Sequence, residues 1–182
     1  MFIEDYKMAK KEFQETIKAP EGISFSLEGS SLIIKGPKGF VKREFSNPSI
    51  KVNVSSNEII LATQTTSKKV KAVFFAYKAH LRNAFLGVKE GYNYKMKICS
   101  GHFPMNVSVA GNTLLIKNFL GEKVPRQVKL KIGASVKVDG ANILIDSVDK
   151  ELAGQVAADI EQATRRPSFD RRIFQDGIYI IE

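Results

Sequence analysis

The chain contains one sequence pattern twice, and this duplication limits the folds that it can adopt. Residues 24–39 align with residues 106–121 at a constant offset of 82 positions. Six positions of the first copy keep their residue in the second, where they are Ser108, Gly111, Leu114, Ile116, Lys117 and Gly121. Weaker matches follow in the same order towards the end of the chain, so we expect the 182 residues to form two copies of one module.

Each copy opens with short segments in which apolar and polar residues alternate. Ile23, Phe25 and Leu27 alternate with serines, as the buried and exposed faces of a strand require. Glu28-Gly29-Ser30 then favours a hairpin turn. Similar segments occur at 32–34, 50–54 and 59–63 in the first copy and at 107–109, 114–116, 136–138 and 143–145 in the second. This pattern predicts short antiparallel strands joined by tight turns.

Later in each copy the apolar residues recur every three or four positions, which predicts one helix per module. In the first copy Ser67 is the expected N-cap and Gly87 the expected end. In the second copy Asp149 is the expected N-cap, and Pro167 lies beyond the end. The two apolar stripes are Val70, Phe74, Tyr77, Leu81 and Phe85, and Leu152, Val156, Ile160 and Ala163.

The two patterns together predict an α+β protein of two repeated domains, each a small antiparallel sheet covered by one helix. After each helix, an acidic residue and a glycine precede one more strand, at 92–98 and at 178–180. We expect an N-terminal extension over residues 1–12, a first repeat over 13–99 and a second repeat over 100–182.

Composition excludes several classes of protein. Cys99 is the only cysteine, which excludes an internal disulfide and fits a reducing cytosol. The chain lacks the run of about 18 apolar residues that a membrane span needs, and residues 1–13 carry charges where a secretory signal would be apolar. The net charge of +9 indicates a polyanionic partner, with nucleic acid first and an anionic membrane surface second.

The sequence offers no pattern typical of catalysis. Cys99, His102 and the distant His80 are too few for a metal site, because a second pair of ligands is missing. The segment Gly36-Pro37-Lys38-Gly39 lacks the spacing of a phosphate-binding P-loop and lies between two expected strands. We therefore expect neither an enzyme nor a bound cofactor or metal.

Three basic segments are candidates for contact with an anion. The first is a line of cations along the first helix, namely Lys71, Lys78, Arg82 and Lys89. The second is the turn at 117–123, continued by Arg126, Lys129 and Lys131, and we expect Phe119 and Leu120 of this turn to be exposed. The third is the segment 165–172, which holds four of the seven arginines and follows the second helix. Arginine grips phosphate with two parallel hydrogen bonds, so this segment is typical of RNA binding.

The sequence resembles the large-subunit ribosomal protein six family, in its archaeal and eukaryotic branch. Three segments carry the resemblance: Arg-Ile-Phe-Gln-Asp-Gly-Ile-Tyr-Ile at 172–180, His-Phe-Pro-Met at 102–105 and the segment 32–39. The resemblance covers residues 13–182, and residues 1–11 form an additional charged segment.

The resemblance implies two α+β domains that bind large-subunit (23S-type) rRNA and help to hold its folded structure. It also implies neighbouring ribosomal proteins as partners, and no membrane or small-molecule substrate. The implied place is cytoplasmic and ribosome-bound, near the subunit interface at the stalk base and close to the factor- and tRNA-binding region.

The second repeat is expected to make the principal RNA contacts. The positions that match the family are His102, Lys117 and Arg172. Charge and position add Lys123, Arg126, Arg165, Arg166 and Arg171.

Two other functions remain open at this point. A DNA-binding or general RNA-binding module outside the ribosome would be expected to carry a helix-turn-helix or an aromatic RNA-recognition motif, and the sequence shows neither. A protein-interaction module would be favoured by exposure of Phe119, Leu120 and the strand that contains Tyr92 and Tyr94.

Overall fold

The computed structural model describes residues 13–55, 58–64, 67–170 and 172–181. The chain forms two compact units, which are divided between Lys89 and Glu90. The sequence had placed this division ten residues later, between residues 99 and 100. The difference arises from strand β7 (Tyr92–Cys99), which pairs with two strands of the second unit.

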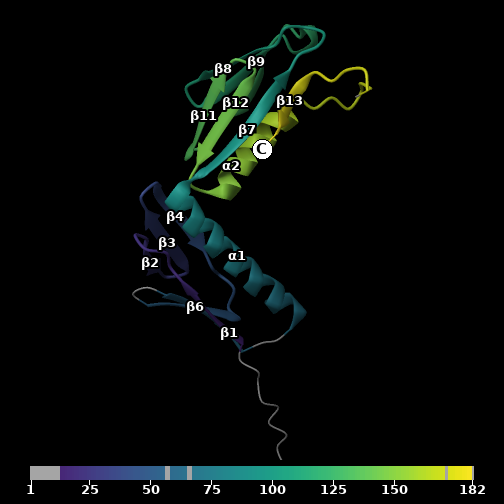
Figure 1. Cartoon of the computed structure of the whole chain (residues 1–182). Coiled ribbons are helices and arrows are strands. Elements are labelled where there is room, and N and C mark those ends of the chain that lie inside the picture. The colour runs from purple at the N-terminus through teal and green to yellow at the C-terminus, as the bar shows by residue number, and fades with distance from the viewer. Residues whose placement is uncertain (1–12, 56–57, 65–66, 171, 182) are drawn as a thin grey trace, which may run out of the picture. The chain divides into compact units, whose positions relative to one another are not determined.

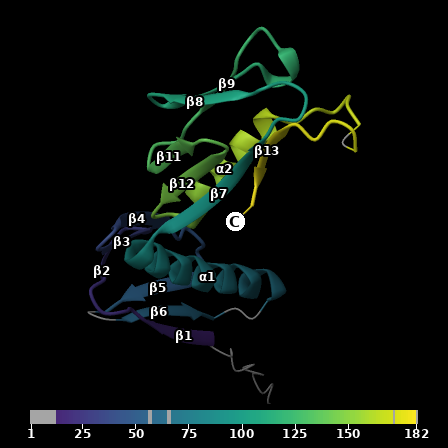
Figure 2. The same ribbon diagram turned by 45° about the horizontal axis from the view of Figure 1, so that its top comes forward.

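In the first unit, two antiparallel sheets of three strands accompany one helix. One sheet has the order β1-β6-β5, and α1 lies along it (Figure 2). The other has the order β2-β3-β4. The elements are β1 (Phe13–Lys18), β2 (Ser24–Glu28), β3 (Ser31–Gly36), β4 (Gly39–Glu44), β5 (Ile50–Val54), β6 (Glu58–Thr63) and α1 (Lys68–Glu90).

The second unit repeats this plan with one additional strand. Its sheets have the orders β10-β9-β8 and β11-β12-β7-β13, and α2 lies against the second of them (Figure 1). The elements are β8 (Asn106–Ala110), β9 (Thr113–Lys117), the short 3-10 turn η1 (Phe119–Gly121), β10 (Arg126–Lys129), β11 (Ala134–Asp139), β12 (Asn142–Ser147), α2 (Lys150–Ala163) and β13 (Gly177–Ile180).

The α+β class and the duplication are confirmed, although each unit divides its strands between two sheets. Strand β7 pairs with β12 in the second unit as β1 pairs with β6 in the first. Strand β13 then adds to the free side of β7. The segment 92–98, predicted to end the first repeat, is therefore an inner strand of a sheet of the second unit.

The predicted helix caps are confirmed, and one predicted helix end is wrong. The Ser67 hydroxyl accepts a hydrogen bond from the amide of Val70, and the Asp149 carboxylate accepts one from the amide of Glu151. Helix α1 continues through the buried Gly87 and ends at Glu90, because Gly91 takes the left-handed conformation (φ 79°) that stops a helix.

Each unit has its own apolar core. In the first unit the buried side chains include Leu32, Ile34, Ile59, Leu61 and Phe74. In the second unit they include Leu114, Ile116, Ile143, Ile145 and Ile160. No helix among the residues that the structure describes is long and apolar enough to cross a membrane.

Candidate functional site

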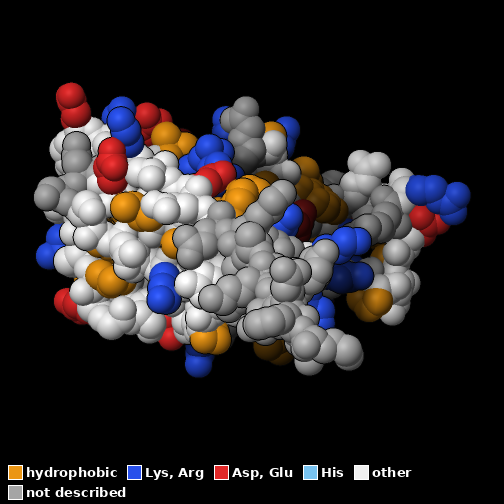
Figure 3. Space-filling model, turned by 90° about the horizontal axis from the view of Figure 1, so that it is seen from below, with side chains coloured by type: hydrophobic (Ala, Val, Ile, Leu, Met, Phe, Trp, Pro, Cys, Tyr) orange, Lys and Arg blue, Asp and Glu red, His pale blue; other side chains and the backbone are white. Residues whose placement is uncertain are grey.

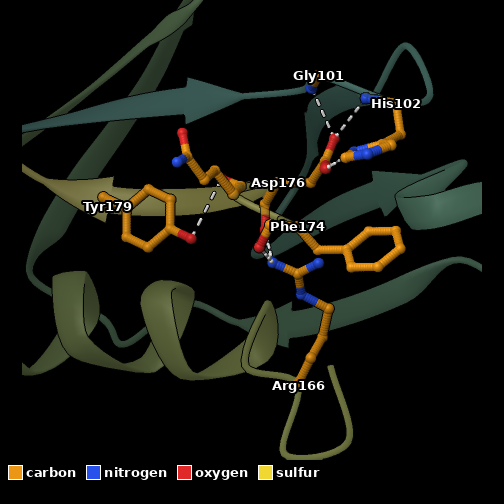
Figure 4. Close-up of polar contacts among 7 residues, drawn as sticks. Gly101, His102, Arg166, Phe174, Asp176 and Tyr179 are labelled. Atoms are coloured by element: carbon orange, nitrogen blue, oxygen red, sulfur yellow. Dashed lines mark hydrogen bonds and ion pairs between the residues drawn. The ribbon is translucent and has the colours of Figure 1, made fainter. Parts of the chain in front are cut away.

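The segment between α2 and β13, residues 164–176, holds four of the eight residues predicted to contact an anion, and the structure describes three of these four. We call it the C-terminal loop. Figure 4 shows Arg166, Phe174 and Asp176 of this loop beside Gly101 and His102, which precede β8.

The buried carboxylate of Asp176 fixes the base of the loop. Its Oδ1 atom accepts hydrogen bonds from the backbone amides of Gly101 (2.6 Å) and His102 (3.0 Å), and its Oδ2 atom lies 2.6 Å from Nδ1 of His102. Burial by itself raises the pKa of Asp176. The hydrogen bonds from His102 and Gly101 lower this pKa by a larger amount, so the net shift is downwards. Because an ionised carboxylate only accepts hydrogen bonds, Nδ1 of His102 is the donor.

Three rings line the inner side of the loop. The imidazole of His102 lies 4.7 Å from the ring of Phe174, and that ring meets Phe169 edge-on at 5.1 Å. His102 is therefore held by a hydrogen bond on one side and a ring on the other. With Nδ1 committed to Asp176, Nε2 is the ring nitrogen left to contact a ligand.

The guanidinium of Arg166 points towards the backbone of Phe174 and Asp176 (Figure 4). Its Nη2 atom donates to the backbone carbonyls of Phe174 (2.9 Å) and Asp176. Its guanidinium also lies over the rings of Phe119 (5.4 Å) and Phe169 (5.8 Å). The Nη1 atom is buried and has no hydrogen-bond partner among the described residues. Arg166 therefore holds the two ends of the C-terminal loop together.

Arg126 has a comparable internal role. Its Nη1 atom donates to the carbonyl of Ala163 (2.6 Å), the last residue of α2. Its Nε and Nη2 atoms donate to the carboxylate of Glu122 (2.8 and 2.5 Å), and this hydrogen bonding lowers the pKa of Glu122. The guanidinium lies 4.3 Å above the ring of Phe119. A cation at the C-terminal end of a helix also interacts favourably with the helix dipole.

The prediction that Phe119 is exposed is wrong. Only 1% of its surface is accessible, and Leu120 is half-buried against the same core. The turn folds inward because Asn118 and Leu120 both take left-handed backbone conformations (φ 58° and 49°). Phe119 thereby becomes the surface on which Arg126 and Arg166 both lie.

Four of the predicted residues extend into solvent. Lys117 ends strand β9, Lys123 follows the inward turn, and Arg165 follows α2. The side chain of Arg172 is 90% exposed, and its partner Asp170 lies two positions earlier at 2.8 Å. This hydrogen bond lowers the pKa of Asp170. Arg171, also predicted, lies outside the residues that the structure describes.

A cavity of about 220 Å³ opens beside Arg165 and Arg166. Its lining combines rings, amides and charged groups: Glu161, Gln162, Thr164, Arg165, Arg166, Phe169 and Tyr179. Thr164 is buried and its hydroxyl accepts a hydrogen bond from the amide of Ile178 (3.0 Å), which ties the end of α2 to β13.

The line of cations predicted on α1 is interrupted. Lys78 forms an ion pair with Glu15 of β1, and both side chains are partly buried. Lys71, Arg82 and Lys89 remain exposed. In the view of Figure 3, Lys and Arg side chains are scattered among hydrophobic and acidic ones rather than gathered in one patch.

Sequence reasoning missed the role of Asp176 and of Phe119. The Asp-Gly pair had been noted only as preceding a strand. The available signal was an acidic residue directly before an apolar strand, since a buried carboxylate needs donors and the Gly101-His102 amides supply them. Among the described residues, no group of three or more His, Cys, Asp or Glu could hold a metal ion.

Comparison with known proteins confirms the resemblance seen in the sequence. Residues 103–177 match the family model described as ribosomal protein L6. The chain is 47% identical to the large ribosomal subunit protein uL6 of Methanosarcina mazei, over 94% of this chain and 98% of the relative. It is 41% identical to the uL6 of Methanococcus vannielii, over 93% of each protein. With the uL6 of Sulfurisphaera tokodaii the identity is 42%, over 91% of this chain and 90% of the relative.

These matches extend over nearly the whole length of both proteins, so they concern the complete duplicated architecture and not one module. The chain therefore belongs to the ribosomal protein L6 family, and it is a structural component of the large ribosomal subunit rather than an enzyme.

Proposed function

We propose that the second unit binds large-subunit rRNA through the exposed cations around the C-terminal loop. The observation that carries the proposal is the separation of arginines into two groups. Backbone carbonyls hold Arg126 and Arg166 against the unit, and these two arginines stabilise the C-terminal loop. Arg165 and Arg172 extend from this loop into solvent. Lys117 and Lys123 lie on the same unit, at the end of β9 and after η1.

This arrangement suits an RNA backbone. Phosphate contacts supply most of the affinity of proteins for nucleic acids, and they position the protein without reading sequence. Contacts on a rigid frame lose less conformational entropy on binding than contacts on a flexible tail. The hydrogen bonds of Asp176 and Arg166 give the C-terminal loop such a frame. His102 adds one imidazole nitrogen at its edge.

The same contacts would help to hold the folded rRNA, because one rigid unit would neutralise several phosphates at once. The family resemblance supports a place near the subunit interface at the stalk base, close to the factor- and tRNA-binding region. It also supports neighbouring ribosomal proteins as partners. The protein-interaction alternative loses its main support, because Phe119 is buried and Tyr92 and Tyr94 pack partly against the core.

The experiment is a salt titration of binding to a large-subunit rRNA fragment. A variant with Lys117, Lys123, Arg165 and Arg172 changed to Ala should bind more weakly, and the slope of log affinity against log salt should fall by about three to four. The control carries the same loss of charge elsewhere on the unit, at the exposed Lys95, Lys97, Lys137 and Lys150. A fall of the same size in the control would overturn the assignment of these contacts to the C-terminal loop.

A further inference from the structure

The outward face of the β2-β3-β4 sheet, in the first unit, carries lysines beside an exposed aromatic ring. Strand register places Ser24, Lys35 and Phe40 in one row across the sheet, and Ser26, Ile33 and Lys42 in the next. The opposite face is the buried one, since Leu32, Ile34 and Val41 are at most 5% exposed. We call the outward face, with the turn residue Lys38, the first-unit sheet face.

Phe40 is 68% exposed although it lies within a regular strand. Its neighbour across the sheet is Lys35, and the two are a directly opposed pair. Beside them lies a shallow hollow of about 170 Å³, lined by Ser24, Phe25, Ser26, Ile33 and Lys35. The small serine side chains leave this hollow open. The first-unit sheet face therefore combines a ring, hydroxyl groups and cations.

The end of this face that carries Lys35 and Lys38 is positively charged. Among the described residues, neither Lys35, Lys38 nor Lys42 forms an ion pair. The acidic residues Glu28 and Glu44 share the row at the other end, four positions along β3 from Lys35, and Glu44 lies two positions along β4 from Lys42. Four residues of strand span about 13 Å, more than the screening length of about 8 Å at physiological salt. The charges of Lys35 and Lys38 are therefore not offset by these acids, whereas Glu44 partly offsets that of Lys42.

The turn that carries Lys38 is held in place by helix α1. The amide of Lys38 donates to the carbonyl of Val88 (3.0 Å), and a side chain at Gly36 would come within 2.8 Å of the same oxygen. Lys38 is therefore presented from a fixed backbone at the edge of the face.

The duplication relates this face to the site in the second unit. Lys35 corresponds to Lys117 and Ser26 to Ser108 in the aligned segments. In the β10-β9-β8 sheet, Lys117 lies opposite Asn106, just as Lys35 lies opposite Ser24. The two modules therefore present a serine and a lysine in the same places on the same face. The first adds Phe40 and Lys42.

We propose that the first-unit sheet face is a second RNA-binding surface of this protein. Lys35, Lys38 and Lys42 contact phosphates, and Phe40 stacks on an unstacked base of the same RNA segment. An RNA strand carries a phosphate and a base in every nucleotide, so it can contact both lysines and an aromatic ring. RNA-binding proteins stack unpaired bases on aromatic side chains. An acidic peptide would satisfy the lysines and leave Phe40 exposed. The proposal rests on the proposed function in taking rRNA as the partner, but it places contacts on a different unit.

The test is a salt titration of the full chain against the large-subunit rRNA, with Lys35, Lys38 and Lys42 changed to Gln. The expected result is a slope smaller by about two to three. Changing Phe40 to Leu should instead weaken binding about tenfold with an unchanged slope, because stacking is not ionic. The matched control changes Lys51, Lys68 and Lys69 of the same unit to Gln, with the same loss of charge.

The outcomes separate this proposal from the proposed function. If the second-unit variant loses its slope and the Lys35, Lys38 and Lys42 variant does not, the first-unit surface is overturned and the proposed function stands. If the reverse holds, the C-terminal loop is overturned and the first-unit surface stands. A slope that falls equally in the lysine variant and its control overturns the proposal, as does a Phe40→Leu variant that binds like the unmodified protein.

Discussion

The Nδ1 atom of His102 lies 2.6 Å from the Oδ2 atom of Asp176, a residue 74 positions later in the chain. The contact joins the segment before β8 to the residue before β13. Two backbone amides, from Gly101 and His102, complete the set of donors around the carboxylate. The base of the C-terminal loop is therefore a buried carboxylate held by three donors, and the donor His102 keeps 38% of its side chain exposed.

Replacing Asp176 by Asn should destabilise the second unit by about 1 to 3 kcal/mol at pH 7, because buried donors lose a charged acceptor. The lowered pKa of Asp176 means that its contribution is present above the ordinary Asp pKa of about 3.9 and is lost as the pH falls through the lower folded value. The difference between the two proteins should therefore shrink below about pH 4.

Urea unfolding of both proteins at pH 7 and pH 3 measures this difference, and hydrogen exchange at the Gly101 amide reports the centre directly. A difference in unfolding free energy that stays constant over this range would show that the carboxylate does not act through its charge.

Arg166 and Arg172 should separate a structural role from a binding role. Arg166→Ala should lower the free energy of unfolding by about 2 kcal/mol, since two loop carbonyls lose their donor. Arg166→Lys should not restore it fully, because an ammonium lacks the planar group that lies over Phe119.

Arg172→Ala, at a fully exposed side chain, should leave thermal unfolding unchanged and weaken RNA binding. Thermal denaturation and a binding titration on the three variants check both expectations. Equal thermal stability of Arg166→Ala and the unmodified protein would remove the structural role.

The sequence predicted the strands and helices that depend on local pattern. The alternating strands and both N-caps depend on residues a few positions apart, and the α+β class follows from them. The duplication is visible because these local patterns recur. Strands β1, β4 and β10 were missed. In β4 the large apolar Phe40 points outward, so the pattern does not mark a buried face. Strand β10 begins at Arg126 and had been interpreted only as a basic segment.

The exposed cations of the site could be predicted from charge, but the direction of each arginine could not. Arg126 reaches a carbonyl 37 positions later, and Arg166 reaches carbonyls beyond a loop. Which arginine turns inward depends on these distant backbone groups and on the ring of Phe119. Composition gives the number of guanidinium groups and says nothing of the acceptors around them.

Phe119→Ala should be among the most destabilising changes in the second unit. The ring is 1% exposed and supports the guanidinium groups of Arg126 and Arg166, so truncation leaves a cavity and removes two cation–π contacts. A loss of about 3 to 5 kcal/mol is expected in urea unfolding. Phe103→Ala, at a ring that is 48% exposed, is the control and should cost much less.

Gly36→Ala should disturb the turn that presents Lys38 in the first unit. A Cβ atom at position 36 would lie 2.8 Å from the carbonyl oxygen and 2.9 Å from the Cβ atom of Val88, so β3 and α1 must move apart. Overpacking of this kind costs about 1 to 3 kcal/mol. The hydrogen bond from the Lys38 amide to the Val88 carbonyl should weaken as well.

Gly29→Ala is the matched control, because nothing lies within 4 Å of its added Cβ atom and its cost comes from the left-handed backbone (φ 61°) alone. That cost is about 1 kcal/mol, without a change at Lys38. Hydrogen exchange at the Lys38 amide distinguishes the two variants: it should accelerate in Gly36→Ala and stay unchanged in Gly29→Ala. Equal exchange rates in both would show that contact with α1 does not fix the turn, and Lys38 would then lack the rigid placement that the first-unit sheet face requires.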